Sequence, residues 1–257
     1  MYFWGMKYFS FRKHLLLLLF SIVFYTACER PEKVPPALFE RDRFVLDFSC
    51  FEGFDSGGTN AKAAYSAVNS WQILLADTSL ACFDVFDEYG LSEANYESAM
   101  YWSWSADFSY NESIYQTYLY GLTENDTVNW NQYVTLDTFV VDYRQMSGIE
   151  YTAGDSAEWT INNHPLAETE STLTFFTKKC SDGIQKQYTS GTTSVTYKDS
   201  VFDIYDSYWL VIGTSGDSVQ MFLDKNTKAG RIQNATAFGS TDWQCWSELL
   251  QNADCNK

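Results

Sequence analysis

The sequence is short of positive charge, histidine and proline, and each shortage narrows the range of functions. Its 257 residues include 17 lysines and arginines against 33 aspartates and glutamates, for a formal net charge of -16. Such a chain offers no cationic surface on which phosphates could displace counterions, so we expect no nucleic-acid binding. Two histidines are too few for a histidine-rich metal site. With only four prolines and 46% apolar residues, the chain is predicted to fold around a core.

Motifs for the common catalytic chemistries are also missing. No Gly-x-x-x-x-Gly-Lys or Gly-x-Gly-x-x-Gly segment is present to bind phosphate, and Cys-x-x-Cys spacing is absent from the cysteines after residue 28. His164 is the one histidine beyond the N-terminal segment, and no Gly-x-Ser-x-Gly lies near it. A solvated turn explains this histidine better than a catalytic triad does. We therefore expect a non-enzymatic protein without a cofactor or metal.

The N-terminus has the pattern of an export signal. Lys7, Arg12 and Lys13 precede an uncharged apolar run, Leu15 to Tyr25, and translation could begin at Met1 or at Met6. As a helix, the run would cover roughly 16 Å of a ~30 Å hydrocarbon core, which is too short for a membrane span.

The end of this run resembles the bacterial lipobox, in which a small residue precedes a cysteine that becomes lipidated and N-terminal. The matching residues are Tyr25-Thr26-Ala27-Cys28. The resemblance implies a signal peptide over residues 1–27, lipid on Cys28 and attachment to a bacterial cell envelope, at the outer membrane. The alternative is an ordinary secretory signal followed by an unrelated cysteine.

The mature chain is predicted to start with a tether and continue as one domain. Residues 28–43 hold three of the four prolines among charges, which is typical of a flexible linker, so we place a single globular domain at 44–257. Phe44 to Phe48 could form a short strand, and Asn60 could cap the helix that follows. That helix is predicted to end at Gly90 and to be mostly buried. Its apolar stripe comprises Ala64, Val68, Trp71, Leu75, Thr78, Cys82 and Val85.

Beyond residue 98 the apolar period changes from 3.6 to 2, which predicts antiparallel strands separated by turns. Asp182-Gly183 and Ser215-Gly216-Asp217 lie between such runs and predict hairpins. We count about nine or ten strands. The predicted fold class is α+β, with an N-terminal, mostly buried helix packed against or inside a large, curved antiparallel β-meander.

The order of these segments resembles a group of uncharacterised Bacteroidota lipoproteins. The shared features are the lipobox, the apolar helix, the strands with Trp102-Ser103-Trp104 and Val128-Asn129-Trp130, and the closing segment Trp243 to Cys255. The resemblance implies envelope location and this fold, and it brings no activity with it.

The cysteines after residue 28 and the tryptophans are most simply explained by structural roles. Cys245 and Cys255 enclose a short loop and form the most credible disulfide, while the pairing of Cys50, Cys82 and Cys180 stays open. Eight tryptophans follow residue 28, and filling the core is their most economical role.

Three hypotheses for function follow. The first is an envelope lipoprotein that serves as a non-catalytic structural or binding module. The second is a carrier or sensor of an apolar ligand, which needs a cavity between helix and sheet. The third is a carbohydrate-binding or glycoside-hydrolysing surface protein, which needs exposed tryptophans or a cleft with two carboxylates. The expected partners are the membrane, through Cys28, and either an apolar ligand or another envelope protein.

Overall fold

The computed structural model describes residues 34–78, 80–98, 100–110, 113–136, 140–153, 155–162, 172–181, 183–202 and 204–255. The chain divides into two compact units, Met1–Pro35 and Pro36–Lys257, and nearly all described residues belong to the second. That unit begins eight residues before the predicted domain start at 44.

Short 3-10 turns and two helices come first in this unit, and strands make up most of the rest. The turns are η1 (Arg41–Arg43), η2 (Ser49–Phe51) and η3 (Phe54–Ser56), and the helices are α2 (Thr59–Thr78), α3 (Leu80–Tyr89) and the short α4 (Ala235–Phe238). The strands are β1 (Asn95–Glu97), β2 (Tyr101–Tyr110), β3 (Ser113–Glu124), β4 (Thr127–Leu136), β5 (Val140–Tyr151), β6 (Ser156–Asn162), β7 (Thr172–Cys180), β8 (Gly183–Ser190), β9 (Thr193–Phe202), β10 (Tyr205–Ile212), β11 (Ser218–Leu223), β12 (Gly230–Asn234), β13 (Gln244–Trp246) and β14 (Asn252–Ala253).

The strands form a single open antiparallel sheet of 14 strands, in which the spatial order is the order along the chain. The α+β class and the meander are confirmed, and so are the hairpins β7–β8 and β10–β11. The predicted count of nine or ten strands is too low. Strands β1, β13 and β14 have only two or three residues each, too few to show a period of two.

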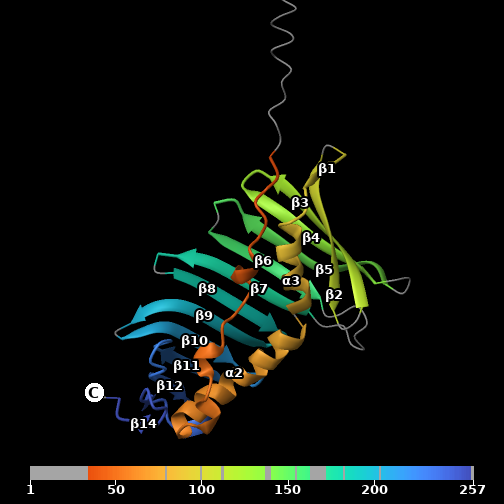
Figure 1. The fold of residues 1–257 in the computed structure, drawn as a ribbon. Coiled ribbons are helices and arrows are strands. Elements are labelled where there is room, and N and C mark those ends of the chain that lie inside the picture. The colour runs from red at the N-terminus through yellow and green to blue at the C-terminus, as the bar shows by residue number, and fades with distance from the viewer. Residues whose placement is uncertain are drawn as a thin grey trace, which may run out of the picture. The chain divides into compact units, whose positions relative to one another are not determined.

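Both long helices lie across one face of the sheet, which we call the inner face (Figure 1). The sequence predicted one helix; the structure has two, α2 and α3. Val68 and Trp71 from α2 and Val85 from α3 are buried, as the predicted apolar stripe requires. Phe86 and Tyr89 of α3 lie outside that stripe and are buried as well. The inner face is therefore a closed core and not an open groove over most of its length.

The segment Pro36–Gly58, which we call the strap, also crosses the inner face (Figure 1). Phe44–Phe48 is not a strand, because it does not join the sheet and its carbonyls at Phe44 and Val45 accept hydrogen bonds from side chains of β8. The Tyr188 hydroxyl donates to the Phe44 carbonyl at 2.5 Å, and Lys186 Nζ donates to the carbonyls of Asp42 and Val45 at 2.7 and 2.6 Å.

Aromatic rings fill the space between the strap, α3 and the sheet. Phe44 lies at the centre, with its ring 4.3 Å from Phe83, 4.5 Å from Phe39 and 5.2 Å from both Trp159 and Phe175. Phe44 is fully buried and Phe39 is 2% exposed, so the strap is part of the core. Residues 36–43, which the sequence assigned to a flexible tether, include this buried Phe39.

Three tryptophans of the inner face lie over a glycine on the adjacent strand. The pairs are Gly121 with Trp130, Gly148 with Trp159, and Gly230 with Trp246. A Cβ atom on any of these glycines would lie within 3.0 Å of the indole ring. Glycine is therefore needed at these strand positions because the ring occupies the volume of the missing side chain.

The C-terminal strands fasten the start of α2. The Asn252 side chain accepts a hydrogen bond from the Asn60 backbone N–H at 3.1 Å, and Gly58 N–H donates to the Leu250 carbonyl at 2.7 Å. Asn60 is thus not the cap that the sequence suggested, because its amide donates instead to the Cys245 carbonyl at 2.8 Å. A disulfide between Cys245 and Cys255 holds the same region, as predicted.

Candidate functional site: a polar trough on the outer face of the sheet

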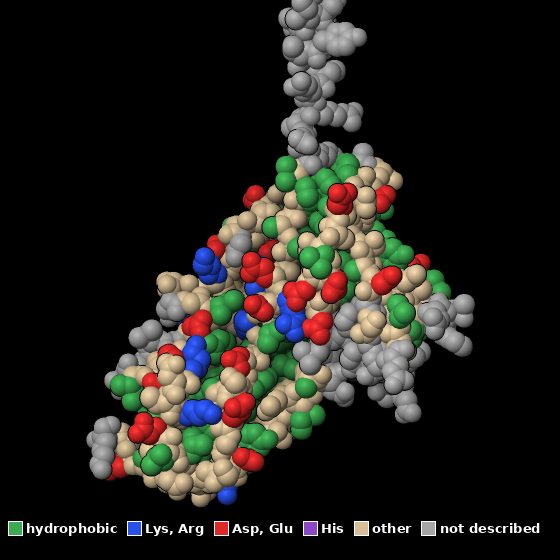
Figure 2. Space-filling view, in the orientation of Figure 1, with side chains coloured by type: hydrophobic (Ala, Val, Ile, Leu, Met, Phe, Trp, Pro, Cys, Tyr) green, Lys and Arg blue, Asp and Glu red, His purple; other side chains and the backbone are tan. Residues whose placement is uncertain are grey.

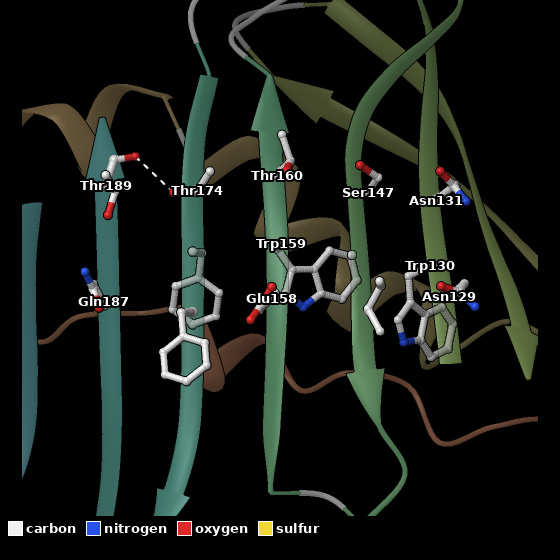
Figure 3. Close-up of a pocket in the computed structure, with 14 residues that line it drawn as sticks. Asn129, Trp130, Asn131, Ser147, Glu158, Trp159, Thr160, Thr174, Gln187 and Thr189 are labelled. Carbon is white, nitrogen blue, oxygen red and sulfur yellow. Dashed lines mark hydrogen bonds between the residues drawn. The ribbon is translucent and has the colours of Figure 1, made fainter. Parts of the chain in front are cut away.

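The face of the sheet opposite the helices, the outer face, carries a trough of about 650 Å³ over strands β4–β8. Each strand contributes two outward side chains, which are half-buried or exposed. Figure 3 shows these side chains in two rows across the sheet. One row is Asn131, Ser147, Thr160, Thr174 and Thr189; the other is Asn129, Ile149, Glu158, Phe176 and Gln187. We call these ten side chains the outer trough.

The two rows follow from the register of the strands. Asn131 pairs with Ser147, Ser147 with Thr160, Thr160 with Thr174, and Thr174 with Thr189. Neighbouring strands lie about 4.8 Å apart, so each row extends roughly 19 Å across the sheet. Inward neighbours such as Trp130 and Trp159 are buried and fix the direction of these side chains by the pleat.

Most polar groups of the trough are available to a ligand. Within the described part of the chain, the side chains of Asn131, Ser147, Thr160 and Gln187 form no hydrogen bond. Thr174 makes one long hydrogen bond, from its hydroxyl to the Thr189 carbonyl at 3.5 Å. Amides and hydroxyls both donate and accept, and Glu158 is the trough's one ionisable side chain. The trough therefore presents a nearly neutral surface for hydrogen bonding.

A second hollow of about 380 Å³ adjoins the trough at Asn131. Its other lining residues are Tyr101 on β2, Tyr120 on β3, Tyr133 on β4 and Asp142 on β5. We call these four residues and Asn131 the tyrosine basin. Burial, and the negative charges of Asp142 and Glu97, raise the pKa of the Tyr120 phenol, so its hydroxyl stays protonated at neutral pH.

Ion pairs on the inner face hold the strap. Arg43 pairs with Glu150 at 2.6 Å, and Arg41 bonds to Asp84 at 2.7 Å. Burial lowers the pKa of Lys186, whose ammonium lies against strap carbonyls. These groups are accounted for by the packing of the strap.

A second inner-face cluster joins Tyr197, Asp199 and Lys225. The Tyr197 hydroxyl donates to Asp199, and Lys225 Nζ lies 3.1 Å from the Tyr197 oxygen and 3.4 Å from Asp199. Burial and the bond to Asp199 raise the pKa of Tyr197 to about 12. Despite its burial, the bonds from Tyr197 and Ile184 lower the pKa of Asp199. The cluster fixes the hairpin β7–β8 because Asp199 also accepts from the Ile184 N–H at 2.9 Å.

The residues singled out from the sequence lie apart from the outer trough. Cys245 and Cys255 are bonded to each other, with their Cα atoms 5.2 Å apart. Cys28 and His164 lie outside the described residues, and so does the side chain of Cys82. Burial raises the pKa of Cys50 to about 12, which keeps this thiol protonated, and Cys180 is half-buried with a free thiol.

The tryptophans do not form a sugar-stacking platform. Six of the eight are buried, namely Trp71, Trp104, Trp130, Trp159, Trp209 and Trp246, while Trp102 and Trp243 are half-buried. The prediction that tryptophans mainly fill the core is confirmed. The sequence did not single out the trough residues as a site, although they lie on the polar face of strands in which apolar and polar residues alternate.

The described residues contain no group of three or more His, Cys, Asp or Glu side chains that could hold a metal ion. No helix in this part of the chain is long and apolar enough to cross a membrane. Acidic side chains are scattered over the helix-covered side and do not gather in one patch (Figure 2).

Neither a protein-family model, nor a curated protein, nor a solved structure matches this chain.

Proposed function

We propose that this protein is a non-catalytic binding module that is attached to a bacterial cell envelope by lipid on Cys28. The export signal and the lipobox-like Tyr25-Thr26-Ala27-Cys28 support the attachment. The ligand surface is the outer trough, and the ligand class is a neutral carbohydrate.

The observation that carries the ligand class is the row of hydroxyl and amide side chains across five strands, in which Thr174 makes one long hydrogen bond and the other side chains make none within the described part of the chain. Sugar hydroxyls donate and accept hydrogen bonds, as these side chains do. Phe176 and Ile149 lie in the neighbouring row, where they can pack against the apolar face of a sugar ring. Glu158 alone carries charge, so the trough has no cationic group for phosphate or sulfate.

The position of the trough argues against a peptide ligand that binds as an added strand. Strands β4–β8 are each paired on both sides, so their backbone groups are already used. Recognition must come from side chains, whereas strand addition depends on a free sheet edge.

Affinity electrophoresis in gels that contain a neutral polysaccharide tests this function. A panel of glucans, mannan and xylan should include at least one polymer that slows the protein. Thr160→Val removes a hydroxyl at constant shape and should weaken retardation about two- to tenfold. Thr123→Val, at an exposed position of β3 outside the trough, is the matched control and should leave retardation unchanged. Equal behaviour of both variants, or free migration in every polymer, would contradict the proposal.

A groove beside α2 supports a second candidate function, the carrier of an apolar ligand. The groove has a volume of about 580 Å³, and its apolar lining includes Trp71, Leu74, Val211 and Val219. Native mass spectrometry of the mature protein, with solvent extraction of any adduct, tests it. A lipid adduct would favour the carrier, and a bare mass would leave the carbohydrate module ahead.

A further inference from the structure

We propose that the tyrosine basin binds an alkylammonium cation, with a quaternary ammonium group as its best ligand. The inference is independent of the carbohydrate proposed for the outer trough, although the two sites share Asn131.

The first argument is the arrangement of the rings. The centroids of Tyr101 and Tyr120 lie 5.3 Å apart at an interplanar angle of 87°, and those of Tyr120 and Tyr133 lie 5.7 Å apart at 68°. Rings at steep angles to one another form differently oriented walls of one hollow. Such walls suit a rounded cation, because the negative face of an aromatic ring attracts a positive charge.

The second argument is the position of Asp142. This residue lines the hollow with the three tyrosines and has a left-handed backbone, with φ at 52°. A hydrogen bond from its N–H to the Thr135 hydroxyl, at 3.2 Å, holds that conformation. The left-handed backbone coincides with an irregularity in the pairing of β4 with β5 between Val134 and Leu136, and this local bend turns the Asp142 side chain toward the hollow. Here the side chain is a carboxylate beside π-faces.

The third argument is the sign of the surrounding charge. Asp142 and Glu97 are the charged groups that act on the Tyr120 phenol, and both are negative. Glu97 accepts a hydrogen bond from the Ser103 hydroxyl at 3.0 Å. Arg144 pairs with Tyr133 across the strands, but it does not line the hollow. The basin therefore favours a cation over a neutral or anionic ligand.

The chemistry of the lining distinguishes an alkylammonium group from a metal ion. Calcium and magnesium need six or more oxygen ligands, and the basin offers one carboxylate, one amide and three phenols. A quaternary ammonium group needs no hydrogen bonds and gains from each ring face. Its methyl groups also fit a volume of about 380 Å³, which is within the usual range for small ligands.

Calorimetric titration of the mature protein with choline and tetramethylammonium tests the proposal. The neutral isostere 3,3-dimethylbutan-1-ol is the control ligand. We expect choline to bind about tenfold or more tightly than the isostere. Absence of choline binding at millimolar concentrations, or equal affinity for the isostere, would overturn the proposal.

Variants separate the role of the basin from general folding. Asp142→Asn removes the charge while asparagine tolerates the left-handed backbone, and it should weaken choline about tenfold. Tyr120→Leu should abolish binding, and Tyr120→Phe, which keeps the ring, should retain it. Near-ultraviolet circular dichroism checks that each variant is folded. Unchanged choline affinity in Asp142→Asn and Tyr120→Leu would count against the site, whatever Thr160→Val does to polysaccharide retardation.

Discussion

Glycine at position 148 shows how one absent side chain determines the packing of the sheet. The Trp159 ring lies where a Cβ on Gly148 would be, and Trp159 is itself only 2% exposed. Gly148→Ala should lower the free energy of unfolding by about 1–3 kcal/mol, the usual cost of overpacking a core. Urea denaturation measures this change.

The control for this substitution is Gly213→Ala. A Cβ at Gly213 would approach the Asp217 carbonyl oxygen at an ordinary 3.8 Å, so unfolding should change by a few tenths of a kcal/mol at most. If both alanine variants have the same stability, the close fit between Gly148 and Trp159 does not contribute to the free energy of unfolding.

Asp199 links stability to pH at the residue scale. Because its folded pKa is lowered, its contribution is complete above the unfolded value, about 3.9, and is lost as the pH falls through the folded value. Asp199→Asn should therefore lower stability at pH 7 by about 1–3 kcal/mol and have a shrinking effect below pH 4. Thermal unfolding from pH 7 to pH 2.5 measures the difference; a pH-independent deficit would contradict the role assigned to the carboxylate.

At the scale of elements, the strap places the border of the folded unit earlier than composition suggests. Pro36–Arg43 includes one proline and four charged residues, but Phe39 packs against Phe44 and Trp159, and Arg43 pairs with Glu150. A chain that begins at Phe44 should therefore unfold at a lower temperature than one that begins at Val34. Phe39→Ala in the longer chain should account for much of the loss, at about 3–5 kcal/mol.

One outcome of the comparison between these two chains would contradict a role for the first part of the strap. If chains that begin at Val34 and Phe44 unfold at the same temperature, the first eight residues of the unit do not contribute to its core. Phe48→Ala, at a half-buried strap position, should cost less than Phe39→Ala and shows whether the strap is uniformly important.

The elements differ in how well local sequence predicts them. The long strands and the hairpins were predictable because Trp130, Val134 and Leu136 alternate with polar residues, and because Asp182-Gly183 and Gly216 mark turns. The division between α2 and α3 was not predictable from the sequence, because no proline or glycine occurs between Thr59 and Tyr89 to mark a break in the helix.

The sites depend on register, which the sequence does not reveal. Asn131 and Thr189 are separated by 58 positions and belong to one row only because four strand pairings align them. Serine, threonine and asparagine are common on the solvent-exposed side of a strand, so their presence does not mark a binding site. The left-handed backbone of Asp142 likewise has no signal in the sequence.

At the scale of the whole molecule, lipid and charge are predicted to act in opposite directions at a membrane. A formal charge of -16 opposes contact with anionic head groups, so the proposed attachment would depend on acyl chains on Cys28. Cys28→Ser should abolish incorporation of radiolabelled palmitate and release the protein from the membrane fraction. Persistent membrane association of the unlabelled variant would contradict lipid anchoring.

The ends of the sheet also matter at this scale. The edge strands β1 and β14 have three and two residues, and β1 pairs only with Tyr101–Ser103 of the ten-residue β2. Among the described strands, the rest of β2 therefore has no partner on that side, where another chain could add a strand.

The sequential strand order has a consequence for export. A polypeptide that crosses a membrane from its N-terminus can pair each strand with the preceding one as soon as it emerges, without waiting for distant segments. The strap and the start of α2 are exceptions, because Phe44 bonds to Tyr188 and Asn60 bonds to Asn252 and Cys245. If the chain is exported as proposed, the first helix of the folded unit reaches its final state only when the last strand has left the translocation channel, and formation of the Cys245–Cys255 disulfide would then mark the end of maturation.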